Sequence, residues 1–159
     1  MRPTPSCEIY IDGASRGNPG PAGIGVVFVG KDGTPSQQLS KYLGETTNNV
    51  AEYLALVYAL VEALRAGHRA LTIKTDSELL ARQLGGQYRV KDPQLRLFHD
   101  LAVQLSRGFA RCTIEHIPRT KNALADRLAG EAVSRRPLQH PPRRPKHGIV
   151  RDAESPSLF

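Results

Sequence analysis

The chain has 159 residues, which is long enough for one domain with a hydrophobic core. Its formal net charge of +7 favours a polyanionic partner. It contains no apolar run long enough to span a membrane and no signal-peptide hydrophobic region in residues 1–7, so we expect a cytoplasmic protein. The two cysteines, Cys7 and Cys112, lack the Cys-x-x-Cys spacing of a zinc site, and we expect both to be reduced thiols.

The first predicted element is a buried strand that ends at an acid. Ile9, Tyr10 and Ile11 form a short apolar run of β-favouring residues. Asp12 follows at the carboxyl end of the run, where open α/β sheets usually place their chemistry. Taken alone, the pair Asp12-Gly13 is more typical of a simple turn. A functional assignment for Asp12 therefore depends on what accompanies it in the rest of the chain.

Two further strands are predicted to complete an antiparallel meander. Residues 14–23 are rich in turn-forming residues, residues 24–29 form an apolar strand, and residues 31–33 are typical of a hairpin connection. Residues 37–44 predict a third, more polar strand at a sheet edge. The glycine-rich turn leads into a strand, so it lacks the helix N-terminus that a dinucleotide pyrophosphate requires.

A long helix is predicted from Asn48 or Asn49 to about Ala66, where a glycine stops it. One face carries apolar residues that step by four and three: Val50, Leu54, Val57, Val61 and Leu64. The other faces are also apolar, which predicts burial nearly all round. Glu52 is the only charged residue in the segment 50–61. Its spacing from Asn49 also fits a capping box, which is a purely structural alternative.

The chain then returns to a strand that is followed by two helices. Residues 70–75 form an apolar strand, and a helix over residues 77–84 follows. Asp76 stands between them, where its structural alternative is to cap the helix. A further helix is predicted from Pro93 to about Arg107.

One more strand and a final helix complete the predicted domain. Residues 110–117 alternate as a strand, and residues 118–121 form a short basic loop. Asn122 is predicted to cap a helix that reaches Val133. Asp126 lies in the first turns of this helix, where a favourable interaction with the helix dipole is the structural alternative.

Four acids occupy comparable places in these elements. Asp12 and Asp76 stand at strand ends, whereas Glu52 and Asp126 lie near helix N-termini. The order β-β-β-α-β-α-α-β-α predicts an α/β fold with a five-stranded mixed sheet, three antiparallel strands followed by two parallel ones, flanked by helices. The first and fourth strands can lie side by side in this sheet, so we expect all four acids at one rim.

Four carboxylates in one cleft repel each other unless cations lie among them. Oxygen ligands without histidine or cysteine suit hard ions such as Mg²⁺ or Mn²⁺. Two such ions roughly 4 Å apart align a water with a phosphodiester and stabilise the leaving oxygen. The acids therefore predict metal-dependent phosphodiester hydrolysis that needs no nucleophilic serine or cysteine.

Four separated segments, residues 10–23, 46–53, 74–77 and 122–129, resemble type 1 ribonuclease H in sequence and in order. The likeness covers nearly all of residues 7–133. It implies the ribonuclease H-like fold and an endonuclease that cleaves the RNA strand of RNA–DNA hybrids with two metal ions, leaving 5′-phosphate and 3′-hydroxyl ends. It also implies that the four acids are the catalytic metal ligands. We expect a monomer, and other RNA-containing duplexes stay open as substrates.

The resemblance further implies which residues contact the substrate. Asn18, Asn48 and Asn49 match groups that read the minor groove of the hybrid, including ribose 2′-hydroxyls, which distinguish RNA from DNA. Thr47 matches a residue that holds a phosphate of the DNA strand. Turn and cap chemistry is the structural alternative for these polar residues.

Two departures from the family pattern favour its compact, archaeal-like branch. Many bacterial members carry a basic protruding helix where this chain has only the short link 87–92. Bacterial and eukaryotic members place a histidine in the loop before the last acid, but the loop 118–121 has none, and His116 is predicted to belong to the strand. Arg119 is the better candidate to hold the cleaved phosphate there, because its guanidinium presents a fixed fork; Lys121 is expected to be a solvated charge.

Residues 134–159 are predicted to be a disordered tail after a ribonuclease H domain that spans residues 1–133. The tail has six Lys or Arg against two acids and contains five prolines. It could contact nucleic acid, or it could be a solvated extension without a role.

Two other functions are weaker alternatives. A hybrid-binding module without catalysis would gain nothing from four clustered carboxylates facing phosphates. A 3′–5′ exonuclease or transposase-like nuclease would share the acids but not the segments 17–20 and 46–49.

Overall fold

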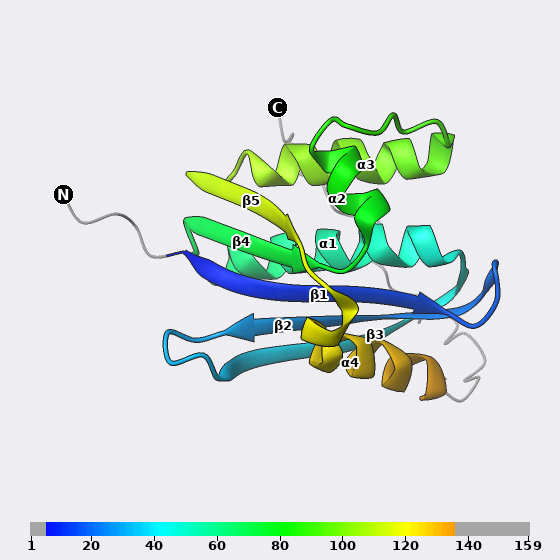
Figure 1. Cartoon of the computed structure of the whole chain (residues 1–159), viewed down its shortest axis with the longest axis horizontal. Helices are drawn as coiled ribbons and strands as arrows, with labels where there is room; N and C mark the ends of the chain where they lie inside the picture. Colours follow the sequence, from blue (N-terminus) through cyan, green and yellow to red (C-terminus); the bar gives the residue numbers. More distant parts are fainter. Residues whose placement is uncertain (1–5, 136–159) are drawn as a thin grey trace, which may run out of the picture.

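A computed structural model describes residues 6–135, which form a five-stranded sheet in the order β3-β2-β1-β4-β5 with four α-helices (Figure 1). The elements, in chain order, are β1 (Cys7–Ser15), β2 (Gly20–Val29), β3 (Pro35–Thr46), α1 (Asn48–Arg65), β4 (Ala70–Thr75), α2 (Glu78–Leu84), α3 (Pro93–Ser106), β5 (Arg111–His116), a short 3-10 turn (Arg119–Lys121) and α4 (Ala123–Ser134). The predicted fold class and the predicted order of elements are confirmed.

Strand β1 is the centre of the sheet and the place where its two halves meet. It pairs antiparallel with β2, which pairs antiparallel with β3. On its other side β1 pairs parallel with β4, which pairs parallel with β5. The parallel pairs are possible because helices carry the chain back across the sheet, α1 between β3 and β4 and α2 with α3 between β4 and β5 (Figure 1). β3 is an edge strand with no fully buried residue, as its polar sequence predicts.

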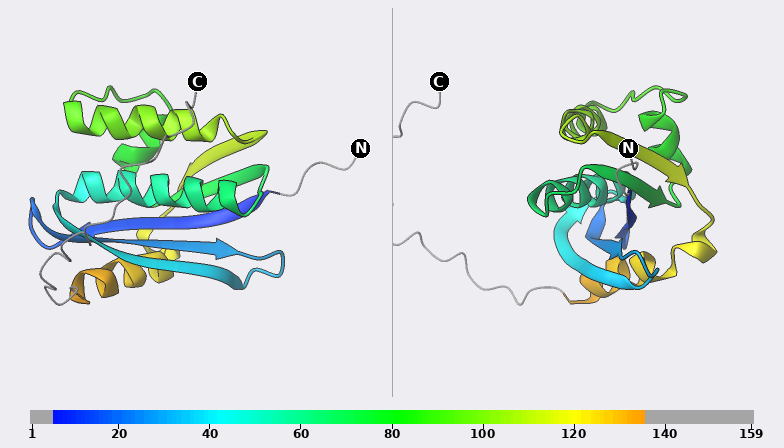
Figure 2. Two further views of the ribbon diagram at one scale, coloured as in Figure 1. Left: turned by 180° about the vertical axis from the view of Figure 1, so that it is seen from behind. Right: turned by 90° about the vertical axis from the view of Figure 1, so that its left-hand side faces the viewer.

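The two faces of β1 are covered by different helices. Figure 2 shows α1 and α3 on one side of the sheet and α4 on the other. Because successive side chains of a strand point to opposite faces, Ile9 and Ile11 join the core beneath α1, whereas Tyr10 packs with the smaller cluster around α4. Among the residues that the structure describes, every helix is too short or too polar to span a lipid bilayer.

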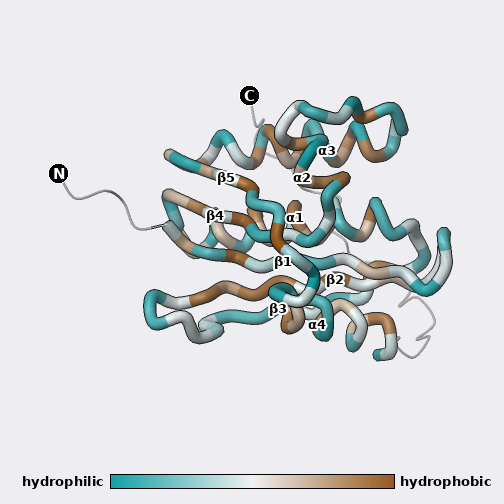
Figure 3. Tube along the Cα trace, in the orientation of Figure 1, coloured by the Kyte–Doolittle hydropathy of each residue, from teal (hydrophilic) through white to brown (hydrophobic). Residues whose placement is uncertain are grey.

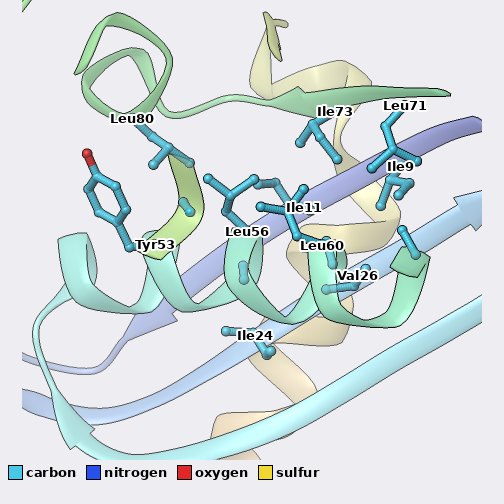
Figure 4. Close-up of a cluster of buried hydrophobic side chains, with 14 of the residues drawn as sticks. Ile9, Ile11, Ile24, Val26, Tyr53, Leu56, Leu60, Leu71, Ile73 and Leu80 are labelled. Carbon is cyan, nitrogen blue, oxygen red and sulfur yellow. The ribbon is translucent and has the colours of Figure 1, made fainter. Parts of the chain in front are cut away.

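The main core lies between the sheet and α1 (Figure 4). Its largest fully buried side chains come from three strands and two helices: Ile9, Ile11, Ile24, Tyr53, Leu56, Leu60, Leu71, Ile73 and Leu80. Figure 3 shows the corresponding concentration of hydrophobic residues along the inner strands, whereas β3 is largely hydrophilic. The core therefore anchors the central strands, which carry the candidate site.

Helix α1 buries a different face from the one that the spacing predicts. The residues that contact the core most deeply include a row of four alanines at four-residue spacing, all fully buried: Ala51, Ala55, Ala59 and Ala63. Leu54, Val57 and Val61 are only partly buried, and Leu64 is 37% exposed. The prediction of burial nearly all round holds from residue 50 to residue 63, where every residue is buried or partly buried. It did not identify the most deeply buried face, because apolar residues on every face gave no signal to separate the faces. The small alanine side chains decide the face, since they let the helix lie close to the sheet.

Several predicted boundaries differ from the observed ones. β1 continues through Ser15, three residues beyond Asp12, so Asp12 lies inside the strand and the turn alternative is wrong. β2 begins at Gly20, four residues earlier than predicted, because its pairing with β1 and β3 continues toward the β1–β2 turn, and β3 is two residues longer than predicted at each end. Helix α4 ends at Ser134, close to the predicted limit of the domain, and the predicted tail lies outside the described residues apart from its first two positions.

Helix α4 lies unusually close to β2. A side chain at Gly25 would overlap the backbone carbonyl of Ala125, and one at Gly23 would meet the Cβ of Ala132. The contact therefore consists of glycines on the strand and alanines on the helix. Gly25 is the cross-strand partner of Asp12, so this close contact lies directly beside the first acid.

We expect Gly25→Ala to lower the free energy of unfolding by about 1–3 kcal/mol, because the added methyl group must displace α4. Gly130→Ala is the matched control in α4, since a Cβ there meets nothing within 4 Å. It should raise stability by roughly 0.5–1 kcal/mol through helix propensity. Urea denaturation of both variants measures the two effects, and equal stabilities would contradict the close packing.

Candidate active site

Asp12 and Asp76 meet because the parallel pairing of β1 with β4 ends just before both of them. The last parallel pair of β1 and β4 joins Ile11 to Thr75, so each acid is the next residue along its own strand. Thr75 is fully buried, and its hydroxyl oxygen accepts a hydrogen bond from the backbone N–H of Ser77 at 3.1 Å. Ser77 caps α2 through a bond from Leu80 N–H, so the alternative in which Asp76 caps this helix is wrong.

Glu52 reaches the same place from α1. The helix is capped by Thr47, whose hydroxyl accepts from the Val50 N–H, so the capping box between Asn49 and Glu52 does not form. The Glu52 carboxylate instead accepts a hydrogen bond from the backbone N–H of Gly13 at 3.1 Å. A Cβ on Gly13 would overlap the backbone of α1 at Ala51 and Glu52. Only glycine at this position lets the helix bring its acid to the strand.

Asp126 is brought to the rim by a residue whose role the sequence did not predict. Asn122 precedes α4 but makes no side-chain cap; its amide group donates to the carbonyl of Ile11 at 2.9 Å instead. Asn122 is fully buried, and the Asp126 N–H donates to its backbone carbonyl at 3.0 Å. The start of α4 is therefore fastened to β1 at the residue before Asp12. A polar residue at a predicted cap position gave no signal for this contact.

Three of the four predicted acids form a tight group. Asp12, Glu52 and Asp76 each offer a carboxylate oxygen, and these oxygens lie within 4.8 Å of one another. Asp126 lines the same hollow and forms an ion pair with Arg119, whose Nη2 lies 3.5 Å from Oδ1. The whole hollow is lined by Asp12, Gly13, Ala14, Asn48, Glu52, Asp76, Ser77, Arg119 and Asp126.

Burial and mutual repulsion perturb the acids of this group. Asp12 is 5% exposed; desolvation, followed by the negative charge of Asp76, raises its pKa from 3.8 to about 8. Desolvation and the neighbouring Asp12 raise the pKa of Glu52 well above its ordinary value, and the Gly13 N–H opposes this shift only in part. The folded chain thus holds carboxylates where it disfavours their charge, which is typical of a functional site.

The donor set fits a hard divalent cation. It consists of carboxylate oxygens from four separate elements, which is the ligand chemistry that Mg²⁺ and Mn²⁺ prefer. A cation placed among them would neutralise the repulsion that raises the pKa of Asp12 and Glu52. Asp126 would join the three clustered acids from the open side of the hollow, where it is 42% exposed.

The predicted substrate-contacting residues lie in the β1–β2 loop and at the start of α1. The Asn18 side-chain oxygen accepts a hydrogen bond from the Asn48 N–H at 3.0 Å, which joins the β1–β2 loop to the start of α1. Thr47 is the N-cap of that helix, and Asn48 and Asn49 are its first two residues, both exposed. The turn-and-cap alternative is therefore correct for the side-chain oxygens of Asn18 and Thr47, because both accept hydrogen bonds from the start of α1. It leaves their donor groups without a hydrogen-bond partner among the described residues.

The two departures from the family pattern are visible in the structure. Residues 85–92 connect α2 and α3 without a helix of their own. His116 belongs to β5, as predicted, and is its last residue. It pairs with Thr75 and does not line the hollow. Arg119 does line it, whereas Lys121 belongs to a different hollow near Tyr10.

The sequence of the chain is similar to a known family and to a known ribonuclease. Residues 10–132 match the family model described as "Reverse transcriptase-like". Over 124 residues the chain is 44% identical to ribonuclease HI of Halobacterium salinarum, which covers 78% of this chain and 62% of that protein. The chain thus spans less than two thirds of the length of that relative.

Two solved structures are similar in fold as well as in sequence. The crystal structure of RNase H1 from Halobacterium salinarum superposes with a TM-score of 0.79 at 42% identity, covering 82% of this chain and 98% of that one. LC11-RNase H1, a protein isolated from compost, was crystallised in complex with an RNA/DNA hybrid. That complex gives a TM-score of 0.77 at 42% identity and covers 81% of this chain and 97% of that one.

We expect Asp12→Asn to raise the melting temperature of the metal-free protein at neutral pH, because it removes a carboxyl group whose ionised form the folded protein disfavours. The wild-type carboxyl keeps its proton up to about pH 8 when folded but loses it near 3.8 when unfolded, so its contribution to stability falls as pH rises between these values. The stability difference between variant and wild type should therefore grow from pH 4 to pH 8. Thermal melts in EDTA measure it, and a difference independent of pH would contradict the perturbed carboxyl.

Proposed function

This chain belongs to the reverse-transcriptase-like family and, within it, to the type 1 ribonucleases H, and from this premise we propose that it cleaves the RNA strand of RNA–DNA hybrids. The proposed products carry 5′-phosphate and 3′-hydroxyl ends. The single observation that carries the proposal is the group of Asp12, Glu52 and Asp76, with oxygens within 4.8 Å of one another beside Asp126. Such a group has no evident structural use, since two of its members are held against their preferred charge state.

The four acids are proposed to hold two divalent ions, Mg²⁺ or Mn²⁺. When bound, such a pair supplies a nucleophilic water and stabilises negative charge on the leaving oxygen. The chain contributes the positions: β1 and β4 fix Asp12 and Asp76 through their register, and the Gly13 N–H orients the Glu52 carboxylate. Asp126 is 42% exposed, whereas Asp12 and Glu52 are buried.

Recognition of the RNA strand is proposed to use donors that the cap contacts leave available. The side-chain oxygen of Asn18 accepts a hydrogen bond from the Asn48 N–H, which leaves the NH₂ group of Asn18 available to donate to a ribose 2′-hydroxyl. The hydroxyl oxygen of Thr47 accepts a hydrogen bond from the Val50 N–H, which leaves its O–H available to donate to a phosphate. Asn48 lines the acidic hollow itself, and Asn49 is the exposed residue next to it. The remaining contacts would come from Lys and Arg side chains, including those of the segment 134–159.

Glu52→Gln should abolish divalent-dependent cleavage of a labelled hybrid, because one charged metal ligand is lost. The protein should stay folded, because the glutamine side-chain oxygen can still accept the hydrogen bond from the Gly13 N–H. The wild type should cut the hybrid RNA internally and leave matched RNA–RNA and DNA–DNA duplexes intact or much less cleaved. Gel analysis in Mg²⁺ and in Mn²⁺, with circular dichroism as the folding control, measures both. A folded variant with near-normal turnover would remove Glu52 from the mechanism.

Arg119→Ala should lower turnover well beyond any loss of hybrid affinity, because its guanidinium faces Asp126 across the hollow and can hold the cleaved phosphate. Lys121→Ala is the matched control, two residues away and outside this hollow, and it should change turnover little. Single-turnover kinetics and hybrid binding separate the two effects; equal turnover in both variants would contradict the role of Arg119.

A further inference from the structure

Tyr53 forms a buried hydrogen bond between the two helices that adjoin the acids. Its hydroxyl donates to the Oε1 of Gln83 at 2.6 Å, and the two side chains are 1% and 6% exposed. Among the described residues, this is the one side-chain hydrogen bond that joins α1 to α2. Figure 4 shows Tyr53 extending from α1 toward the segment that carries Leu80.

Each end of this bond lies close along the chain to a candidate metal ligand. Tyr53 follows Glu52 directly on α1, so a movement of its backbone moves the Glu52 carboxylate. Gln83 lies in α2, a helix of only seven residues whose cap, Ser77, follows Asp76. The short helix gives little independent stability, because isolated helices of this length are marginal. Fixing its far end therefore fixes the segment that begins at Asp76.

A third helix supports the same junction. The Nε2 of His99, on α3, lies 3.3 Å from the backbone carbonyl of Gln83, and the rings of His99 and Tyr53 meet edge to face at 6.5 Å. The phenol and the amide are thus enclosed by α1, α2 and α3. Burial makes the loss of one partner costly, since the other then has no water to replace it.

We propose that Tyr53 and Gln83 are positioning residues that hold Glu52 and Asp76 at the separation required by the metal ions. Glu52 and Asp76 are not joined by sheet pairing or by a direct hydrogen bond, and like charges favour their separation. The Tyr53–Gln83 bond opposes that separation from the core side. The inference rests on the proposed metal site and extends it from the acids to the residues behind them.

A purely structural role predicts something different. Removal of one partner leaves a buried polar group unpaired and destabilises the protein, whereas removal of both restores much of the stability. If the bond also positions the acids, metal affinity will stay low in the double variant, because the link between α1 and α2 is still missing. Stability and metal affinity should therefore separate in a double-mutant cycle.

The test measures binding of Mn²⁺ alone, by electron paramagnetic resonance titration without nucleic acid, together with urea denaturation. The variants are Tyr53→Phe, Gln83→Met and the double substitution. We expect Mn²⁺ affinity to fall roughly tenfold in all three, in the lower part of the range typical of residues behind metal ligands. Stability should fall in the single variants and recover in the double one. Tyr58→Phe, one turn and a half further along α1, is the control and should bind Mn²⁺ normally.

Each outcome decides between the alternatives. Wild-type affinity in Tyr53→Phe, or recovered affinity in the double variant, would overturn the positioning role. If a single variant fails to fold, the double variant still carries the test, because it leaves no buried polar atom of this pair unmatched. A wild-type protein that does not bind Mn²⁺ would instead contradict the proposed function, so the two failures are distinguishable.

Discussion

Carboxylates that repel one another at the rim of the sheet are the constraint on which the rest of the structure depends. Desolvation and the charge of Asp76 raise the pKa of Asp12 to about 8, and the pKa of Glu52 is also raised. Left to themselves, the segments that carry these acids would move apart. They stay together because each backbone is fixed by contacts that do not involve the carboxylates: the β1–β4 register, the alanine face of α1, and the Asn122 amide on Ile11.

Close approach from both faces of β1 is what glycine makes possible here. Gly13 lies on the face toward α1, and its missing side chain lets the backbone at Glu52 reach the strand. Gly25, the partner of Asp12 on β2, lies on the opposite face and admits the backbone of α4 at Ala125, one residue before Asp126. Two acids thus reach Asp12 from opposite sides of the sheet, each across a glycine. The site is therefore built where two helix backbones approach the sheet too closely for a side chain to fit between them, so small displacements would alter the separation of the acids.

The sequence was sufficient to predict the order of elements, the mixed sheet and the place of the acids on it. Strand alternation and the apolar run at residues 9–11 identify β1, and motif order indicates which acids share a rim. Three details could not be predicted because they depend on contacts distant in sequence. Asn122 looks like a cap but binds Ile11, 111 residues earlier; Glu52 looks like part of a capping box but accepts from Gly13. The buried face of α1 was ambiguous because every face is apolar, and only the shape of the sheet selects the alanines.

The cap of α1 connects substrate recognition to the acids. Asn18 and Thr47 hold the first turn of the helix with their oxygens, and Glu52 lies in the next turn. A substrate that binds the donors of these two residues would therefore contact the start of the helix whose following turn is fixed by the Gly13 N–H and by the Tyr53–Gln83 hydrogen bond. On the proposed function, a hybrid bound with its ribose hydroxyls in register would reinforce the position of Glu52, whereas a DNA strand without 2′-hydroxyls would leave it unsupported. Discrimination of the sugar and assembly of the metal site would then depend on one short stretch of helix.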